Sequence, residues 1–70
     1  MEYYVQCKLK KNDAITIAYI AEEGAVVGSS MLFKDEKNSG RWTVLEVYAA
    51  SKALKADVLS KRSNIFDSIK

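Results

Sequence analysis

Three groups of residues have side chains that could do chemistry. Cys7 could act as a thiolate nucleophile, and the adjacent Glu22 and Glu23 could exchange protons or bind a metal ion. Residues 35–40, Asp-Glu-Lys-Asn-Ser-Gly, are rich in the oxygen ligands that calcium prefers. The 70 residues include no histidine, which excludes Ser-His-Asp and Cys-His catalysis and a His-ligated catalytic zinc.

Each of these groups has a simpler structural interpretation. Cys7 alternates with apolar residues on one face of a predicted strand, and no base activates it. Adjacent glutamates in a turn point apart, so Glu22 and Glu23 are interpreted as a solvated turn. Lys37 occupies the place where an EF-hand needs Asp or Asn, which favours a polar hairpin loop over 35–40. We therefore predict no catalytic residue, no cofactor and no metal.

The N-terminal part of the chain predicts an antiparallel hairpin. Residues 3–9 alternate with period 2, the pattern of a half-buried strand. Tyr3, Val5, Cys7 and Leu9 share its apolar face, and Tyr4, Gln6 and Lys8 share its polar face. Residues 10–13 have turn chemistry, and residues 14–20 are apolar on both faces, which favours a central strand.

The remainder predicts two more strands and a helical tail. A single turn ends at Gly24, a third strand over 26–34 bends at Gly28, and a fourth strand covers 41–48. From Ser51, a candidate N-cap, apolar residues recur at helical spacing, as one helix or two short ones. We expect one small domain, residues 1–70, of mainly β (α+β) class. Its architecture is a four-stranded antiparallel SH3-like or OB-like partial barrel with a short C-terminal helical segment.

The composition limits the cellular compartment and the kinds of binding partner that we expect. A chain of 70 residues buries only about 60% of its unfolded surface, so pairing with a copy or a partner would help to stabilise it. Its single cysteine cannot close an intrachain disulfide, which favours a reducing cytoplasm. The formal net charge of +2 falls short of a strongly basic nucleic-acid binder. No apolar run approaches the ~20 residues of a membrane-spanning helix, so no membrane partner is expected.

Tyr4, Lys8, Lys10 and Arg41 form the candidate partner-binding surface. An exposed Tyr4 beside Lys8 and Lys10 would stack bases and neutralise phosphates as single-strand binders do. Tyrosine and arginine are equally suited to protein contacts. Trp42, next to Arg41, is predicted to anchor the core instead.

A pattern over residues 14–66 resembles a family of small uncharacterised proteins of tailed bacteriophages. In that family Thr-x-Ala-Trp-Ile-Pro-Glu leads to Ala-x-Val-Gly, then to Gly-x-Trp, a Val-rich strand and Val-Leu-x-x-Arg-Ser. The matching residues are Thr16, Ala18, Tyr19 in place of Trp, Ile20, Glu22, Ala25, Val27, Gly28, Gly40, Trp42, Val44, Val47, Val58, Leu59, Arg62 and Ser63. Ala21 stands where the family has Pro. The resemblance implies a phage protein made in the bacterial cytoplasm that acts by binding, and it implies no particular chemistry.

Two functions follow as hypotheses. The first is a non-enzymatic phage accessory protein that binds a bacterial host protein in the host cytoplasm and modulates or inhibits it, in takeover or counter-defence. The alternative is a small β-barrel that binds single-stranded nucleic acid through Tyr4, Lys8, Lys10 and Arg41. A second copy of the chain is a further candidate partner, as in a virion component or another homo-oligomer.

Overall fold

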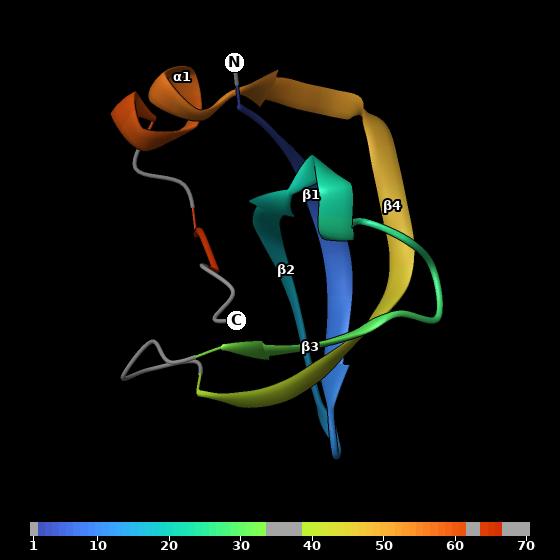
Figure 1. Ribbon diagram of the computed structural model, residues 1–70. Coiled ribbons are helices and arrows are strands. Elements are labelled where there is room, and N and C mark those ends of the chain that lie inside the picture. The colour runs from blue at the N-terminus through green and yellow to red at the C-terminus, as the bar shows by residue number, and fades with distance from the viewer. Residues whose placement is uncertain (1, 34–38, 62–63, 67–70) are drawn as a thin grey trace.

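The computed structural model describes residues 2–33, 39–61 and 64–66, which fold around one curled sheet (Figure 1). The elements in chain order are β1 (Tyr3–Lys11), β2 (Ala14–Ala21), the 3-10 helix η1 (Glu22–Gly24), β3 (Ser30–Phe33), β4 (Gly40–Leu54) and α1 (Lys55–Ser60). All strand pairs are antiparallel, in the order β2-β1-β4-β3. The predicted mainly β partial barrel with a short C-terminal helix is therefore confirmed.

The predicted hairpin is present, but its second strand lies at the edge of the sheet. β1 and β2 pair from Tyr4 with Ala21 to Lys11 with Ala14, which leaves a two-residue turn. Asn12 adopts a φ of 54° in this turn, a left-handed conformation that Asn tolerates. The prediction of a central strand over 14–20 is wrong. An antiparallel sheet can leave one face in water, so apolar residues on both faces of a strand do not place it at the centre.

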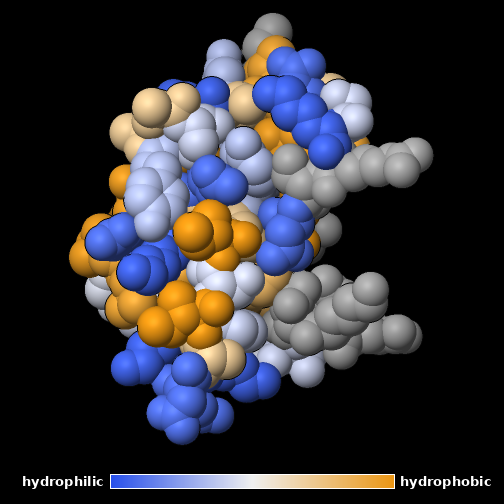
Figure 2. Space-filling view, turned by 180° about the vertical axis from the view of Figure 1, so that it is seen from behind, coloured by the Kyte–Doolittle hydropathy of each residue, from blue (hydrophilic) through white to orange (hydrophobic). Residues whose placement is uncertain are grey.

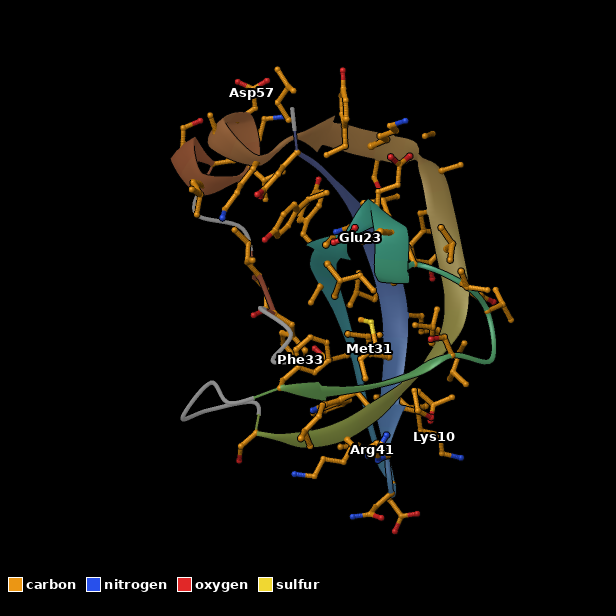
Figure 3. All side chains as sticks on the ribbon, in the orientation of Figure 1. Lys10, Glu23, Met31, Phe33, Arg41 and Asp57 are labelled. Carbon is orange, nitrogen blue, oxygen red and sulfur yellow. The ribbon has the colours of Figure 1, made fainter. Side chains whose placement is uncertain are left out.

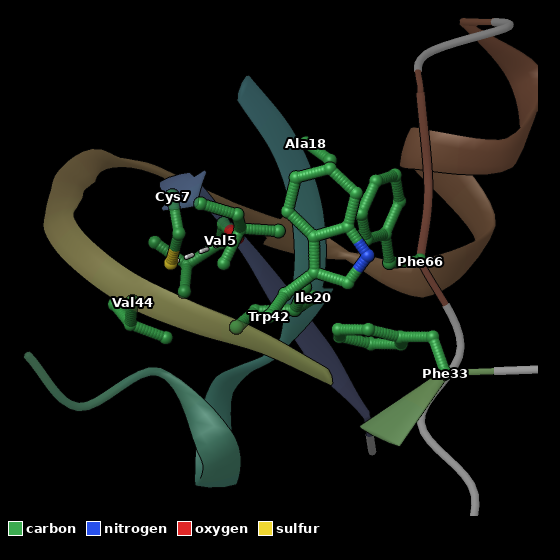
Figure 4. Close-up of a cluster of buried hydrophobic side chains, with 9 residues drawn as sticks. Val5, Cys7, Ala18, Ile20, Phe33, Trp42, Val44 and Phe66 are labelled. Atoms are coloured by element: carbon green, nitrogen blue, oxygen red, sulfur yellow. Dashed lines mark hydrogen bonds between the residues drawn. The ribbon is translucent and has the colours of Figure 1, made fainter. Parts of the chain in front are cut away.

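One cluster of buried side chains fills the inside of the curl (Figure 4). Its members are Val5, Cys7, Leu9, Ala18, Ile20, Phe33, Trp42, Val44 and Phe66. Trp42 is 6% exposed, which confirms its predicted role in the core. The Phe66 ring packs edge to face against both Phe33 and Trp42, with centroids 5.0 and 5.3 Å away. Aromatic pairs in this geometry add stability beyond the area they bury.

Phe66 reaches the core because residues 64–66 lie along β2. The Tyr19 N–H donates to the Asn64 carbonyl at 2.8 Å, and the Phe66 N–H donates to the Tyr19 carbonyl at 3.0 Å. These two bonds form a single parallel bridge between Tyr19 and Ile65. The C-terminal segment thus bonds to the edge strand β2 and carries Phe66 across to Phe33 of β3, the strand at the opposite edge.

A β-bulge in β4 reverses the side-chain alternation along this strand. Relative to β1, Leu45 is an extra residue between Val44 and Glu46. Val44 is buried before the bulge and Val47 packs against the core after it. Glu46 and Tyr48 consequently project away from the core, whereas strict alternation from Trp42 puts both on the core face.

A second irregularity bends β4 farther along, between Tyr48 and Ala53. The Ser51 hydroxyl accepts a hydrogen bond from the Gln6 N–H at 2.7 Å and donates one to the Tyr48 carbonyl at 2.6 Å. It therefore replaces a backbone pairing that the bend removes. The prediction that Ser51 caps a helix is wrong, because β4 continues to Leu54 and α1 begins at Lys55.

The segment before β3 also differs from its predicted form. Gly28, with a φ of 90°, lies in a turn, and β3 begins only at Ser30. The Gly28 N–H donates to the Val44 carbonyl, and the Val44 N–H donates to the Ser29 carbonyl, each at 2.9 Å. The chain does turn at Gly28, but the strand predicted from residue 26 begins only at Ser30, so Gly28 precedes the strand and does not bend it.

Removal of the Phe66 ring should destabilise the whole sheet. We expect Phe66→Ala to lower the free energy of unfolding by about 3–5 kcal/mol, comparable with the entire stability of so small a domain. Leu59→Ala, at an exposed apolar position of α1, is the matched control and should change it by less than about 0.5 kcal/mol. Urea unfolding followed by circular dichroism measures both values. Equal stabilities of the two variants would show that residues 64–66 do not support the core.

Candidate interaction surface

The side of the sheet that points away from the core is called the outer face. It consists of Gln6, Lys8 and Lys10 from β1, Ile15, Ile17 and Tyr19 from β2, Ser30 and Leu32 from β3, and Arg41, Thr43, Glu46 and Tyr48 from β4. Seen from behind, the molecule carries apolar side chains set among strongly hydrophilic ones (Figure 2). The register decides which of these side chains are neighbours.

Three of the four predicted surface residues lie on the outer face. Lys8 is opposite Glu46 of β4, and Lys10 is opposite Thr43. Arg41 is two residues before Thr43 and so shares its face. Lys10 and Arg41 lie at the same end of the sheet (Figure 3). The fold therefore gathers these three cations on one surface.

Tyr4 does not belong to this surface, which corrects the sequence prediction. Its side chain is only 5% exposed. Tyr4 pairs with two alanines, Ala21 and Ala53, at the end of the sheet where α1 begins. The Lys55 ammonium of α1 lies 5.8 Å from the centre of the Tyr4 ring. Because α1 packs at this end, a position that alternation assigns to solvent is buried.

The sequence analysis missed two residues of the outer face, Ile15 and Ile17. Their side chains are 55% and 46% exposed. In the register of the hairpin Ile15 is opposite Lys10 and Ile17 is opposite Lys8. The signal was present in the sequence, because the lysines mark the solvated face of β1 and a two-residue turn fixes which residues of β2 share that face.

Glu46 is the one acidic residue of the outer face as defined above. It lies opposite Lys8, and its carboxylate accepts a hydrogen bond from the Tyr48 hydroxyl at 2.9 Å. This bond raises the pKa of Tyr48, since a phenol that donates to a carboxylate is harder to ionise. Lys8, Lys10 and Arg41 against Glu46 give the face an excess of positive charge.

The turn containing Glu22 and Glu23 forms as predicted, in η1, with both side chains exposed. Glu22 pairs with Lys52 of β4 at 2.6 Å. The same ammonium lies 4.7 Å from the centre of the Tyr3 ring. Its hydrogen bond to Glu22 raises the pKa of Lys52. This group of charges is a surface ion pair with a cation–π contact, which in such exposed places contributes modestly to stability.

Cys7 lies where the alternation predicted, with no exposed surface. Its Sγ is 3.8 Å from the Val5 carbonyl, to which the thiol donates weakly. Burial raises the pKa of the Cys7 thiol, because the thiolate would lose its hydration. The thiolate is therefore disfavoured in the folded protein.

The described residues contain neither a group of metal ligands nor a helix that could span a membrane. Among them, no three His, Cys, Asp or Glu side chains group as metal ligands. No helix in this part of the chain has the length and apolarity needed to cross a membrane. Most of the predicted loop 35–40, together with Arg62 and Ser63 of the phage pattern, lies outside the described residues.

Comparisons with family models, with curated proteins and with solved structures found no match to this chain.

Cys7 should react with thiol reagents mainly when the protein unfolds locally or globally, because only then is the thiol accessible. At mildly alkaline pH we expect its reaction with a chromogenic disulfide to be at least about 100-fold slower in the native protein than in urea, because the thiol is buried and its pKa is raised. Native and denatured rates within a few fold of each other would contradict the burial.

The raised pKa of the Cys7 thiol should make the folded protein less stable as pH becomes alkaline. The contribution of the neutral thiol is fully present below the pKa of the unfolded chain and declines as pH rises through the folded value. Cys7→Ala should therefore lose less stability than the parent protein at alkaline pH. Urea unfolding of both proteins across this range measures the difference, in which the contribution of Lys52 cancels and that of Tyr48 cancels except for its small interaction with Cys7.

Proposed function

We propose that this protein is a non-enzymatic bacteriophage accessory protein that binds a bacterial host protein in the host cytoplasm and modulates or inhibits it. The outer face is the proposed docking surface. The phage origin rests on the residue pattern over 14–66, and the binding role rests on the exposed pair Ile15 and Ile17 beside Lys8 and Lys10.

That pair of isoleucines is the observation that carries the proposal. Single exposed apolar residues are ordinary on a protein surface. Ile15 and Ile17 are two residues apart on one strand, so they project side by side from the same face. Each lies directly opposite a lysine. An apolar patch bordered by polar side chains is common in protein interfaces, and here the lysines border the pair on the side of β1.

The charges of the outer face specify the partner's chemistry. Lys8, Lys10 and Arg41 outnumber Glu46, so a complementary partner presents an apolar patch bordered by carboxylates. Matched charges of this kind mainly increase the rate of association and select the partner, while burial of the isoleucines supplies affinity. An acidic host protein with an exposed apolar patch fits this surface.

Nucleic acid fits the surface less well. Single-strand binders stack bases on exposed aromatic rings, and Tyr4, the ring assigned to that role, is buried. A phosphate backbone running along the cations would also meet the Glu46 carboxylate, which lies opposite Lys8. Both observations favour a protein partner.

A capture experiment with matched variants tests the docking surface. Tagged protein captures host proteins from a bacterial lysate, and mass spectrometry identifies them. The double variant Ile15→Thr, Ile17→Thr keeps β-branched residues in the strand and should reduce recovery of the specific partner at least about tenfold. The control Val26→Thr, Val27→Thr alters an adjacent apolar pair that is 59% and 62% exposed in the loop before β3, and it should leave recovery unchanged. Equal recovery by both variants, or loss in the control alone, would refute the outer face as the docking site.

A salt titration against a single-stranded oligonucleotide tests the alternative. We expect no binding in the micromolar range, because Tyr4 is buried and the two tyrosines of the outer face, Tyr19 and Tyr48, are only partly exposed for stacking. Micromolar binding that weakens steeply from low to moderate salt, and that falls again in Lys8→Gln, Lys10→Gln, would replace the proposed function with nucleic-acid binding.

A further inference from the structure

The outer edge of β2 offers backbone groups for pairing. The N–H and C=O of Tyr19 both point to this edge, where they bond to residues 64–66. Backbone direction repeats every second residue of a strand, so the N–H and C=O groups of Ile17 and Ile15 point the same way. The Ile17 carbonyl accepts a bond from the Asn64 side chain at 3.4 Å. Within the described part of the chain, no hydrogen bond joins the Ile15 N–H or C=O to a group beyond this edge.

Among the described residues, the edge of β2 is covered only where residues 64–66 bond to Tyr19 and Ile17, and the strand itself lacks the usual sequence protection. Natural edges are blunted by charge, proline or short length. The eight residues Ala14–Ala21 include no charged residue, no proline and no glycine. β3, the strand at the other edge, is only four residues long. The uncharged, β-branched composition of β2 is typical of a segment that pairs with another strand.

We propose that a second copy of this chain pairs antiparallel with β2 through the edge at Ala14–Ile17, forming a two-fold symmetric dimer. This inference goes beyond the proposed function and does not require the host protein. An edge of this kind is self-complementary, since the free N–H and C=O of Ile15 in one copy can bond with the equivalent segment in the other. Such isologous contacts are the commonest way in which identical chains associate.

Electrostatics favours this edge-to-edge arrangement of two copies. No charge lies on β2, so the paired strands bring no like charges together. Lys8 and Lys10 lie one strand farther in, and across the dimer the two β1 strands are about three strand spacings, or roughly 14 Å, apart. That separation exceeds the Debye length of about 8 Å at physiological ionic strength. Packing the two outer faces together would instead oppose Lys8, Lys10 and Arg41 of both copies.

The dimer would enlarge the docking surface without covering it. Side chains on the outer face project at right angles to the new hydrogen bonds, so Ile15 and Ile17 stay exposed. Both copies would place these isoleucines side by side in one apolar stripe, with Lys8 and Lys10 of each copy along its two sides. Dimer formation would also add free energy of association, which compensates for the marginal stability of so small a domain.

Sedimentation of the purified protein from micromolar to millimolar concentration tests the dimer. We expect a monomer–dimer equilibrium that Ile15→Pro weakens at least about tenfold, because proline removes an edge N–H that does not pair with β1. Ile15→Thr keeps this N–H and is the matched control, expected to dimerise within a few fold of the parent protein. Circular dichroism checks that both variants are folded.

Amide hydrogen exchange of the unmodified protein gives a readout that needs no variant. The amides of Ile15 and Ile17 should become more protected as concentration rises, while those of exposed residues in α1 stay unchanged. A monomer at every concentration, a dimer indifferent to Ile15→Pro, or edge amides with constant protection would each overturn the proposal. Those outcomes leave the host-capture experiment unaffected, so the two proposals can fail separately.

Discussion

The contact of Phe66 with Phe33 and Trp42 connects the two edges of the curled sheet. Phe33 belongs to β3 at one edge, and Phe66 follows a segment bonded to β2 at the other. Without that contact, the core cluster would lose the aromatic packing that joins its two edges. A sheet of this size has little stability in reserve, so the packing of these three rings is a large part of what holds the two edges together. The outer face keeps its shape because the inner face is held in this way.

β4 adapts to the curl by departing from regular pairing at two places. The extra residue Leu45 turns Glu46 outward and returns Val47 to the core. Farther along, the Ser51 hydroxyl satisfies the Gln6 N–H where the backbone of β4 bends away. Bulges and bends of this kind let a single long strand follow a curved core without leaving buried donors unpaired. They also decide which charges reach the outer face.

Sequence periodicity predicted what depends on neighbouring residues, and it failed where distant segments meet. The alternation from Val5 to Lys10, the turn at Asn12 and the burial of Trp42 were predicted, whereas Tyr3, assigned to the apolar face, is 38% exposed. Tyr4 is buried because α1, some fifty residues later, packs at its end of the sheet, and alternation within β1 carries no information about that contact. The central position assigned to residues 14–20 failed for a related reason. Apolar residues on both faces do not distinguish a buried strand from an edge strand with an exposed apolar face.

Ile15 and Ile17 contribute less to the stability of the monomer than buried isoleucines do, because about half of each side chain is exposed. Threonine is also β-branched and suits an extended strand equally well. About half of each isoleucine side chain is in water, where its apolar surface contributes no burial energy. Exposed isoleucines on an uncharged edge strand also carry a risk of aggregation that natural sheets usually avoid. Since neither side chain belongs to the buried core cluster, both are available for the contacts proposed above. The docking surface and the paired edge are the two contacts whose geometry places both isoleucines against another molecule or beside their own copies.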